Sequence, residues 1–140
     1  MIKYKTLFIS DLHLGSSHSN AEAFLNFIRN VECEKMYLCG DIFDFHVIKT
    51  SFLWSETFNT VIQKLLRKAR HGTNIIYIPG NHDYQLRKFH RYKFGNIEIY
   101  TSHIHLVDGK TPIKIMHGDE FDTFYHQKKI LYAIGSAIYS

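Results

Sequence analysis

Short apolar runs alternate with longer amphipathic segments over the first half of the chain. Residues 4–9, 35–39 and 74–78 are apolar runs that predict buried strands. Between them, residues 21–30 and 56–70 carry apolar side chains at a spacing of about 3.6 residues, which predicts two amphipathic helices. The alternation of strand and helix predicts parallel strands joined by crossover helices, and therefore an α/β fold.

Capping signals mark where the two helices begin. The segment from Ser19 to Glu22 fits a capping box in which Ser19 is the N-cap. Ser55 is predicted to cap the second helix, and His71, which is followed by a glycine, is predicted to end it.

The second half of the chain predicts shorter elements. Residues 84–94 are basic and aromatic, and they predict a short helix or a loop. A hairpin turn is predicted at 108–111. Residues 123–139 predict a final helix that is apolar almost all round from residue 130, so it needs cover on several sides. Three further strands are predicted, over residues 97–100, 103–107 and 112–116.

Polar side chains follow four of the predicted strands at the points where the strands end. Ligands in open α/β sheets bind outside the carboxyl ends of the strands. Each polar group alone would be an ordinary turn, but four of them together indicate a site. The residues are Asp11 and His13, then Asp41 and Asp44, then Asn81, His82 and Asp83, and finally His117 and Asp119.

Five of these side chains are expected to converge on one edge of the sheet as metal ligands. This set of oxygen and nitrogen donors contains no thiolate, so it suits Mn, Fe or Zn ions better than a structural cysteine site. Asp41 is predicted to bridge two metal ions. Asp11 and His13 would bind the first ion. Asn81 and His117 would bind the second.

Four further residues complete the predicted site. His82 is expected to face a phosphate held by the metals, and to donate a proton or to stabilise developing charge. Asp44, Asp83 and Asp119 are expected to orient histidines or backbone groups.

Composition and charge narrow the class of protein. The chain of 140 residues, 45% hydrophobic and 21% charged, is expected to form one globular domain at most. The formal net charge of +4 permits an anionic substrate, but the Lys and Arg residues are scattered, so specific nucleic-acid binding is not expected. Cys33 and Cys39 form no metal-type pair and indicate no disulfide, which favours a reducing compartment. With no signal peptide or membrane-spanning run, we expect a cytoplasmic location, with contact to a membrane surface as a further expectation.

Four motifs resemble those of the calcineurin-like metallophosphoesterase superfamily, and they occur in its order. Within that superfamily, the chain is most similar to the bacterial UDP-2,3-diacylglucosamine hydrolases of lipid A synthesis. The resemblance runs from about Tyr4 to the end of the chain. The motifs are Asp11-Leu12-His13, Gly40-Asp41-Ile42-Phe43-Asp44, Gly80-Asn81-His82-Asp83 and His117-Gly118-Asp119.

The resemblance implies a fold and an activity. The fold is an α/β sandwich of mixed sheets flanked by helices, with two divalent metal ions, Mn²⁺ being the expected one. The reaction is hydrolysis of a pyrophosphate, which releases UMP and the lipid monophosphate lipid X. By this analogy Asn81 and Arg87 contact substrate phosphate, the apolar loop over residues 42–54 helps with acyl chains, and the protein lies at the inner membrane.

One family motif, Gly-His-x-His, is absent, although it would supply one histidine to each metal. His103 and His105 share a strand face but precede His117, so we interpret them as part of a sheet face. A single incomplete domain over residues 1–140 is therefore expected, with its C-terminal part missing and a complementing C-terminal chain as a partner. Two alternatives stay open: a dinuclear phosphoesterase with another substrate, and a truncated remnant without catalysis.

Overall fold

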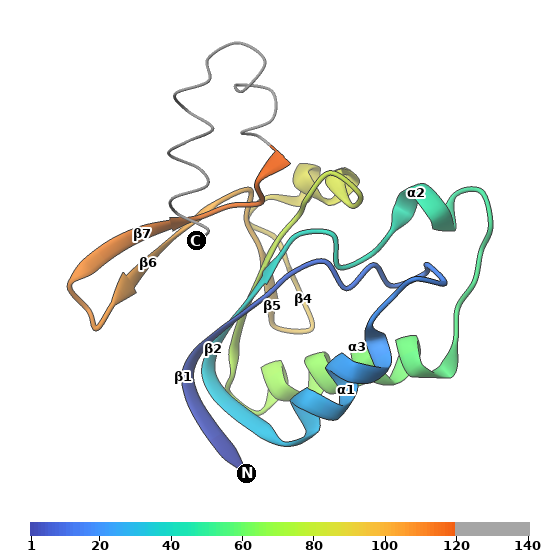
Figure 1. Cartoon of the computed structure of the whole chain (residues 1–140). Helices are drawn as coiled ribbons and strands as arrows, with labels where there is room; N and C mark the ends of the chain where they lie inside the picture. Colours follow the sequence, from blue (N-terminus) through green and yellow to red (C-terminus); the bar gives the residue numbers. More distant parts are fainter. Residues whose placement is uncertain (120–140) are drawn as a thin grey trace.

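The structure is a computed structural model that describes residues 1–119 (Figure 1). Its sheet order is β1-β2-β3-β5-β4, with β4 antiparallel and the others parallel, and β6 and β7 form a separate antiparallel pair. The predicted α/β fold with mixed sheets and flanking helices is confirmed, and the helix expected over residues 123–139 lies outside the described residues. The elements are β1 (Ile2–Ile9), α1 (Ala21–Arg29), β2 (Val31–Cys39), α2 (Phe45–Ile48), α3 (Glu56–Arg70), β3 (Asn74–Ile78), the 3₁₀ helix η1 (Tyr84–Phe89), β4 (Lys93–Phe94), β5 (Ile97–Ile99), β6 (His103–Val107) and β7 (Thr111–Ile115).

The two long helices, α1 and α3, cover one face of the five-stranded sheet (Figure 1). Burying one aliphatic side chain contributes roughly 1.5–3 kcal/mol, so this core holds the strands, and with them the strand ends, in place. None of the helices in residues 1–119 is long and apolar enough to cross a membrane. The core joins Ala21, Phe24, Leu25 and Ile28 of α1 and Phe58, Val61, Leu65 and Ala69 of α3 to Met36, Leu38, Ile75 and Tyr77 of the sheet.

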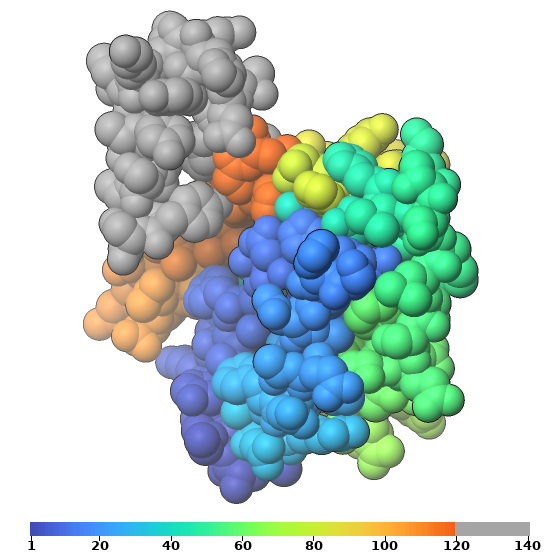
Figure 2. Space-filling model, turned by 45° about the vertical axis from the view of Figure 1, so that its right-hand side comes forward, coloured from blue at the N-terminus to red at the C-terminus, as the bar shows by residue number. Residues whose placement is uncertain are grey.

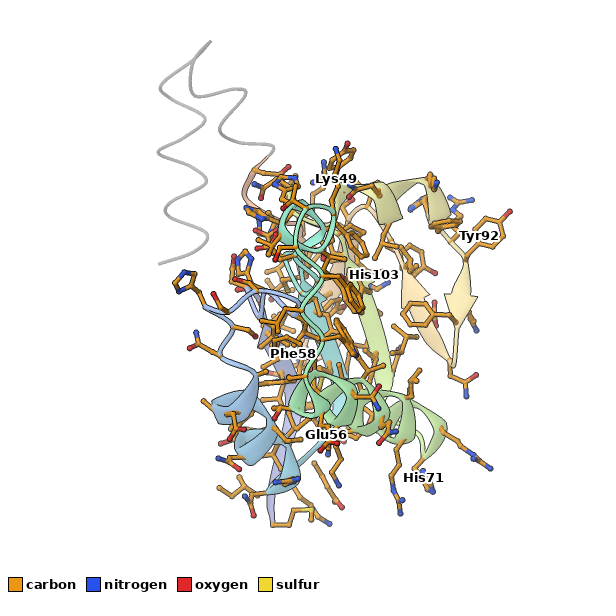
Figure 3. All side chains as sticks on the ribbon, turned by 90° about the vertical axis from the view of Figure 1, so that its right-hand side faces the viewer. Lys49, Glu56, Phe58, His71, Tyr92 and His103 are labelled. Atoms are coloured by element: carbon orange, nitrogen blue, oxygen red, sulfur yellow. The ribbon has the colours of Figure 1, made fainter. Side chains whose placement is uncertain are left out.

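The two long helices differ in how well the sequence predicts their starts. Ser55 caps α3 as predicted, because its Oγ accepts a hydrogen bond at 3.2 Å from the backbone N–H of Phe58, which Figure 3 labels. The prediction of a capping box at Ser19 is wrong. The N-cap of α1 is Asn20, whose side chain makes no capping hydrogen bond. The Ser19 hydroxyl donates instead to the carbonyl of Leu12 at 2.5 Å, so a bond to the preceding loop replaces the local cap.

The β6–β7 hairpin lies against the other face of the sheet. Tyr37, Ile76 and Ile78 are buried on this face, and Ile115 of β7 packs against them. His103 and His105 of β6 both reach the Tyr37 hydroxyl, in agreement with their interpretation as part of a sheet face.

The segment over residues 84–94 contains more structure than the sequence predicts. It forms η1 and then the short strand β4, which pairs with β5. Gly95 and Asn96 make the turn between the two strands, with φ of 52° and 66°. A strand of two residues is too short to show an alternating pattern, which explains why it was not predicted.

Candidate metal centre and active site

The loops that follow β1 and β2 run side by side and carry the first candidate ligands. The backbone N–H of Asp11 donates to the carbonyl of Gly40 at 3.0 Å, and that of His13 donates to the carbonyl of Asp41 at 2.9 Å. Asp11, His13 and Asp41 have φ of 59°, 49° and 53°. Such values are uncommon outside glycine and cost on the order of 1–3 kcal/mol each. Three candidate ligands therefore share a strained backbone that the paired loops hold in place.

Asp41 lies at the centre of the candidate site. Its Oδ2 is 3.4 Å from Nε2 of His117 and 3.9 Å from Nε2 of His13. Its Oδ1 accepts a hydrogen bond from the backbone N–H of His82 at 2.8 Å. Burial would raise the pKa of Asp41, but the hydrogen bonds from His117 and the His82 backbone lower it to about 2. The carboxylate is thus ionised at neutral pH, as a ligand between two metal ions must be.

The candidate ligands form two groups that share Asp41. In the first group, donor atoms of Asp11, His13 and Asp41 all lie within 4.8 Å of one another. In the second group, Nε2 of His117 lies 3.2 Å from Oδ1 of Asn81 as well as close to Asp41. The structure therefore brings the five side chains expected as ligands close together around Asp41, and their binding of two metal ions remains a prediction.

Histidine hydrogen bonds in the site leave one ring nitrogen of each histidine for a ligand. Nδ1 of His117 lies 2.8 Å from the carbonyl oxygen of Cys39, which can only accept, so this nitrogen carries the hydrogen. Nδ1 of His13 and Nδ1 of His82 lie 2.9 and 3.0 Å from the two carboxylate oxygens of Asp44. Burial would lower the pKa of His117, but the hydrogen bonds to Asp41 and to the Cys39 carbonyl raise it to about 9, so its Nε2 donates to Asp41 and a metal ion would displace that proton. Since Nδ1 of each ring is turned to a protein acceptor, Nε2 is the nitrogen that His13 and His117 would offer to a metal. The donor set therefore fits two divalent ions.

Asp44 contacts two histidines of the site, and an orienting role remains a prediction. It is also the N-cap of α2, because its Oδ1 accepts a hydrogen bond at 3.2 Å from the backbone N–H of Val47. Burial would raise the pKa of Asp44, but the hydrogen bonds from His82 and His13 lower it. An ionised carboxylate thus joins α2 to two histidines of the site.

His82 lies between the two groups of candidate ligands and a histidine that the sequence analysis did not single out. Its ring centroid is 4.9 Å from that of His13 and 4.4 Å from that of His46. The hydrogen bond to Asp44 raises the pKa of His82, against a smaller opposite effect of burial. The only sequence signal for His46 is its place two residues after Asp44, within the aromatic-rich segment over residues 42–54.

Asp83 is buried beneath the site loops and binds their backbone groups. Its side chain is fully buried, and its Oδ1 accepts hydrogen bonds from the backbone N–H groups of Gly80 at 2.6 Å and Asp41 at 3.1 Å. Its Oδ2 accepts from the N–H of Ile42 at 3.0 Å and from the Tyr77 hydroxyl. Burial, and then the charge on Asp83, raises the pKa of Tyr77, so the phenol remains a donor. The described contacts of Asp83 are thus with backbone groups and the Tyr77 hydroxyl, and its predicted orienting role stays a prediction.

Two glycines make room for the ring of His117. A Cβ on Gly40, which also has φ of +84°, would overlap Nδ1 of that ring. A Cβ on Gly80 would lie 2.9 Å from Cδ2 of the same ring and 2.5 Å from Oδ1 of Asp41. The glycines of the second and third motifs thus form a cradle in which His117 approaches the backbone closely.

Arg87 and Asp119 are bound to each other. The Nη2 of Arg87 donates to both carboxylate oxygens of Asp119, at 2.9 and 2.8 Å, and to the carbonyl of Pro79 at 3.3 Å. This pair joins η1 to the segment after β7, which are seen in yellow and orange next to each other in Figure 2. Contact between Arg87 and substrate phosphate, and an orienting role of Asp119 toward histidines, remain predictions.

A cavity of about 910 Å³ opens beside the candidate ligands. Asp11, Asn81 and His117 line its polar part, and Phe8 and Ile113 belong to its apolar part. Each group of candidate ligands therefore has a member on the wall of this cavity, Asp11 in the first group and Asn81 and His117 in the second.

Comparison with known proteins gives results of two kinds. A family model described as calcineurin-like phosphoesterase matches residues 4–134. Proteins named UDP-2,3-diacylglucosamine hydrolase are similar to the chain over most of its length. The one from Histophilus somni (strain 129Pt) is 32% identical over 122 residues, which are 85% of the chain and 51% of the relative. The one from Aliivibrio fischeri (strain MJ11) is 31% identical over 118 residues, 81% of the chain and 47% of the relative. The chain spans about half the length of these relatives.

Proposed function

The chain belongs to the calcineurin-like phosphoesterase family, and we propose that it hydrolyses the pyrophosphate bond of UDP-2,3-diacylglucosamine. The products would be UMP and lipid X. The observation that carries the proposal is the convergence of two donor groups on the shared carboxylate of Asp41. The names of the relatives support the substrate.

Two divalent ions, with Mn²⁺ as our choice, would be held by Asp11, His13 and Asp41 and by Asp41, Asn81 and His117. When bound, such a pair polarises a phosphoryl group and lowers the pKa of a bound water. The ionised Asp41 lies between the two sets, and the hydrogen bonds at Nδ1 of His13 and His117 keep both rings turned with Nε2 towards it.

His82 would act as the proton donor. Its Nδ1 is held by the Asp44 carboxylate, so Nε2 is left to face a phosphate. The same bond raises the pKa of His82, which favours the protonated form of the ring. A proton at Nε2 can then pass to the phosphate oxygen that leaves, or stabilise the charge that develops there. Asn81 turns its Oδ1 to His117, so its amide N–H₂ can donate to another phosphate oxygen.

We also propose that the loop after β2 binds the lipid part of the substrate, at the cytoplasmic surface of the inner membrane. Phe43, Phe45 and Trp54 stack on one another in this loop. Phe52 and Leu53 project from it and are 74% and 48% exposed. Exposed apolar side chains beside a phosphate site suit a substrate with both a nucleotide and acyl chains.

A C-terminal complement would finish the site, either as a continuation of the same polypeptide or as a separate chain. Within residues 1–119, β1 pairs with β2 alone, so its other edge can accept a further strand. The relatives are about twice as long as the matched region. Their second halves would supply further ligands next to the cavity.

The test is UMP release from UDP-2,3-diacylglucosamine with Mn²⁺, for the wild-type chain, His82→Ala and the control His71→Ala. His71 is exposed and lies at the C-cap of α3. Loss of a proton donor lowers kcat by about 10²–10⁴-fold, so His82→Ala is expected to fall that far while His71→Ala matches the wild type.

Three other outcomes separate the alternatives. Turnover of a simple phosphodiester without turnover of the lipid would refute the substrate and leave a phosphoesterase. Calorimetric binding of Mn²⁺ without turnover of either compound would refute catalysis by this chain, and would favour a remnant or a missing complement. Equal activity of the wild type and His82→Ala would refute the role of His82.

A further inference from the structure

The position of His117 depends on how the β6–β7 hairpin is attached to the rest of the molecule. β7 ends at Ile115, two residues before His117. In the described part of the chain, β6 and β7 pair only with each other, so no strand ladder joins the hairpin to the five-stranded sheet. The ion pair between Lys5 and Asp108 at the hairpin tip is exposed and contributes little. Side-chain contacts nearer the sheet must therefore hold the hairpin.

Tyr37 provides the most specific of these contacts. Its side chain is fully buried, on the sheet face away from the helices. Its hydroxyl lies 3.0 Å from Nδ1 of His103 and 3.3 Å from Nδ1 of His105. The Tyr37 ring also stacks on Phe8, with centroids 5.2 Å apart and an interplanar angle of 3°, and Ile115 packs against the same cluster.

The two hydrogen bonds at the Tyr37 hydroxyl are complementary. A phenol has one hydrogen to donate, so it can donate to one Nδ1 and must accept from the other. One of His103 and His105 therefore carries its hydrogen on Nδ1, and the other does not. Burial, and then the charge on Lys35, lowers the pKa of both histidines, which keeps the two rings neutral. The Tyr37 hydroxyl can therefore hydrogen-bond to both histidines of β6 at the same time.

Tyr37 and the carbonyl group that binds His117 belong to the same strand. Cys39, two residues after Tyr37 on β2, offers the carbonyl that accepts from Nδ1 of His117 at 2.8 Å. The hairpin is therefore fastened to β2 twice, at the Tyr37 hydroxyl through β6 and at the Cys39 carbonyl just beyond β7. If the first attachment is lost, His117 keeps the bond to the Cys39 carbonyl, the neighbouring Arg87–Asp119 pair and the packing of Ile115, but no hydrogen bond from β6 to β2 fixes the hairpin.

We propose that Tyr37, His103 and His105 form a latch that positions His117 in the metal centre. Tyr37 touches neither substrate nor the candidate ligands; it acts through the hairpin. This inference rests on the proposed function for the role of His117 as a ligand. The attachment of the hairpin by the latch does not depend on that function.

The test compares Tyr37→Phe with Tyr100→Phe as a matched control. Phenylalanine keeps the ring and its stacking and removes only the hydroxyl. The Tyr100 ring lies edge-on to the His103 ring at 5.0 Å between centroids, a contact that phenylalanine keeps, and its hydroxyl donates to Glu98 at 3.0 Å, outside the latch. Amide hydrogen exchange over residues 103–117 is expected to become about tenfold faster in Tyr37→Phe, since one or two hydrogen bonds are lost, and to change less than twofold in Tyr100→Phe.

Two ligand readouts separate positioning from a general loss of stability. The ¹⁵N signals of the His117 ring are expected to shift in Tyr37→Phe, and the Kd for Mn²⁺ is expected to rise about tenfold, both under conditions where the variant is fully folded. Unchanged ring signals and an unchanged Kd would refute positioning. Unchanged hydrogen exchange would refute the latch. A wild-type chain that binds no Mn²⁺ would instead count against the proposed function, and the exchange data would still decide on the latch.

A second pair of variants guards against a Tyr37→Phe protein that fails to fold. The amide nitrogen of asparagine can stand in for Nδ1 of a histidine, whereas valine offers no polar atom. His105→Asn is therefore expected to keep slow exchange in the hairpin, and His105→Val to lose it. Equal exchange in the two variants would overturn the proposal.

Discussion

The buried carboxylate of Asp83 offers the sharpest test of how the site loops are held. Asp83→Asn keeps the size of the side chain and removes one acceptor oxygen. If the remaining oxygen keeps the bonds to Gly80 and Asp41, the new amide N–H₂ faces the N–H of Ile42. Two donors then meet, and a buried N–H loses its partner. The Tyr77 hydroxyl can turn and accept, so the backbone donors bear most of the cost.

The magnitude follows from the lost bonds. A hydrogen bond to a charged group is worth about 1.5–3 kcal/mol, and an unsatisfied buried donor costs about 1–3 kcal/mol. The bond from the N–H of Phe43 at 3.4 Å is long and adds little. The Asp83→Asn variant no longer buries a charge, and this offsets part of the cost of the lost hydrogen bonds. We therefore expect a loss of roughly 3 kcal/mol, against total stabilities of about 5–15 kcal/mol for native proteins.

Urea unfolding measures this loss through the single tryptophan of the chain. Trp54 stacks on Phe43 at 6.1 Å between centroids, next to the loops that Asp83 binds. With a slope of about 2 kcal/mol per molar urea, the midpoint is expected to fall by about 1.5 M. Asp108→Asn is the matched control, because Asp108 is exposed in the hairpin turn, and its midpoint should match the wild type. A loss below about 1 kcal/mol in Asp83→Asn would refute the reasoning.

Three further predictions concern the helix cap, the glycine cradle and the hairpin. Ser55→Ala removes the cap of α3 and is expected to cost about 1 kcal/mol in urea unfolding, and an unchanged midpoint would contradict the cap. Gly80→Ala places a methyl group against the candidate ligands, so calorimetry should show at least about a tenfold weaker binding of Mn²⁺. Burial, and next Lys35, lowers the pKa of His103 and His105, so the unfolded chain binds more protons and stability should fall as the pH drops below about 6.5. Urea midpoints from pH 7 to pH 5 check this, and the double variant with glutamine at both positions should lose part of the slope; an equal slope would argue against it.

The sequence predicts the framework of the fold because hydrophobic spacing is a local signal. The apolar runs before Asp11, Asp41 and Asn81 are strands, and their order brings the three strand ends to one edge. The parallel arrangement follows from the helices between them, so the meeting of the candidate ligands could be expected. Ser55 was predictable for the same reason, since its partner is three residues away.

Features that depend on bonds between distant segments were not predictable in this way. The hydroxyl of Ser19 binds the loop at Leu12 in place of its own helix, a choice that only the folded chain offers. His46 reaches His82 because α2 folds over the end of β3, and no spacing in the sequence gives that contact. Arg87 has the guanidinium group expected of a phosphate contact, but in the structure it binds the carboxylate of Asp119, 32 residues away.

Asp44 makes the site a thermodynamically coupled unit. One oxygen of this carboxylate binds His13, and the other binds both His82 and the first turn of α2. A change that strengthens or weakens the bond of Asp44 to one partner also changes its bonds to the others, and this coupling free energy is the same whichever partner is changed first. Double-mutant cycles between His13 and His82 should therefore be non-additive, because both rings bind the same carboxylate. An attempt to adjust the acidity of the proposed donor alone would also alter metal affinity and the order of α2.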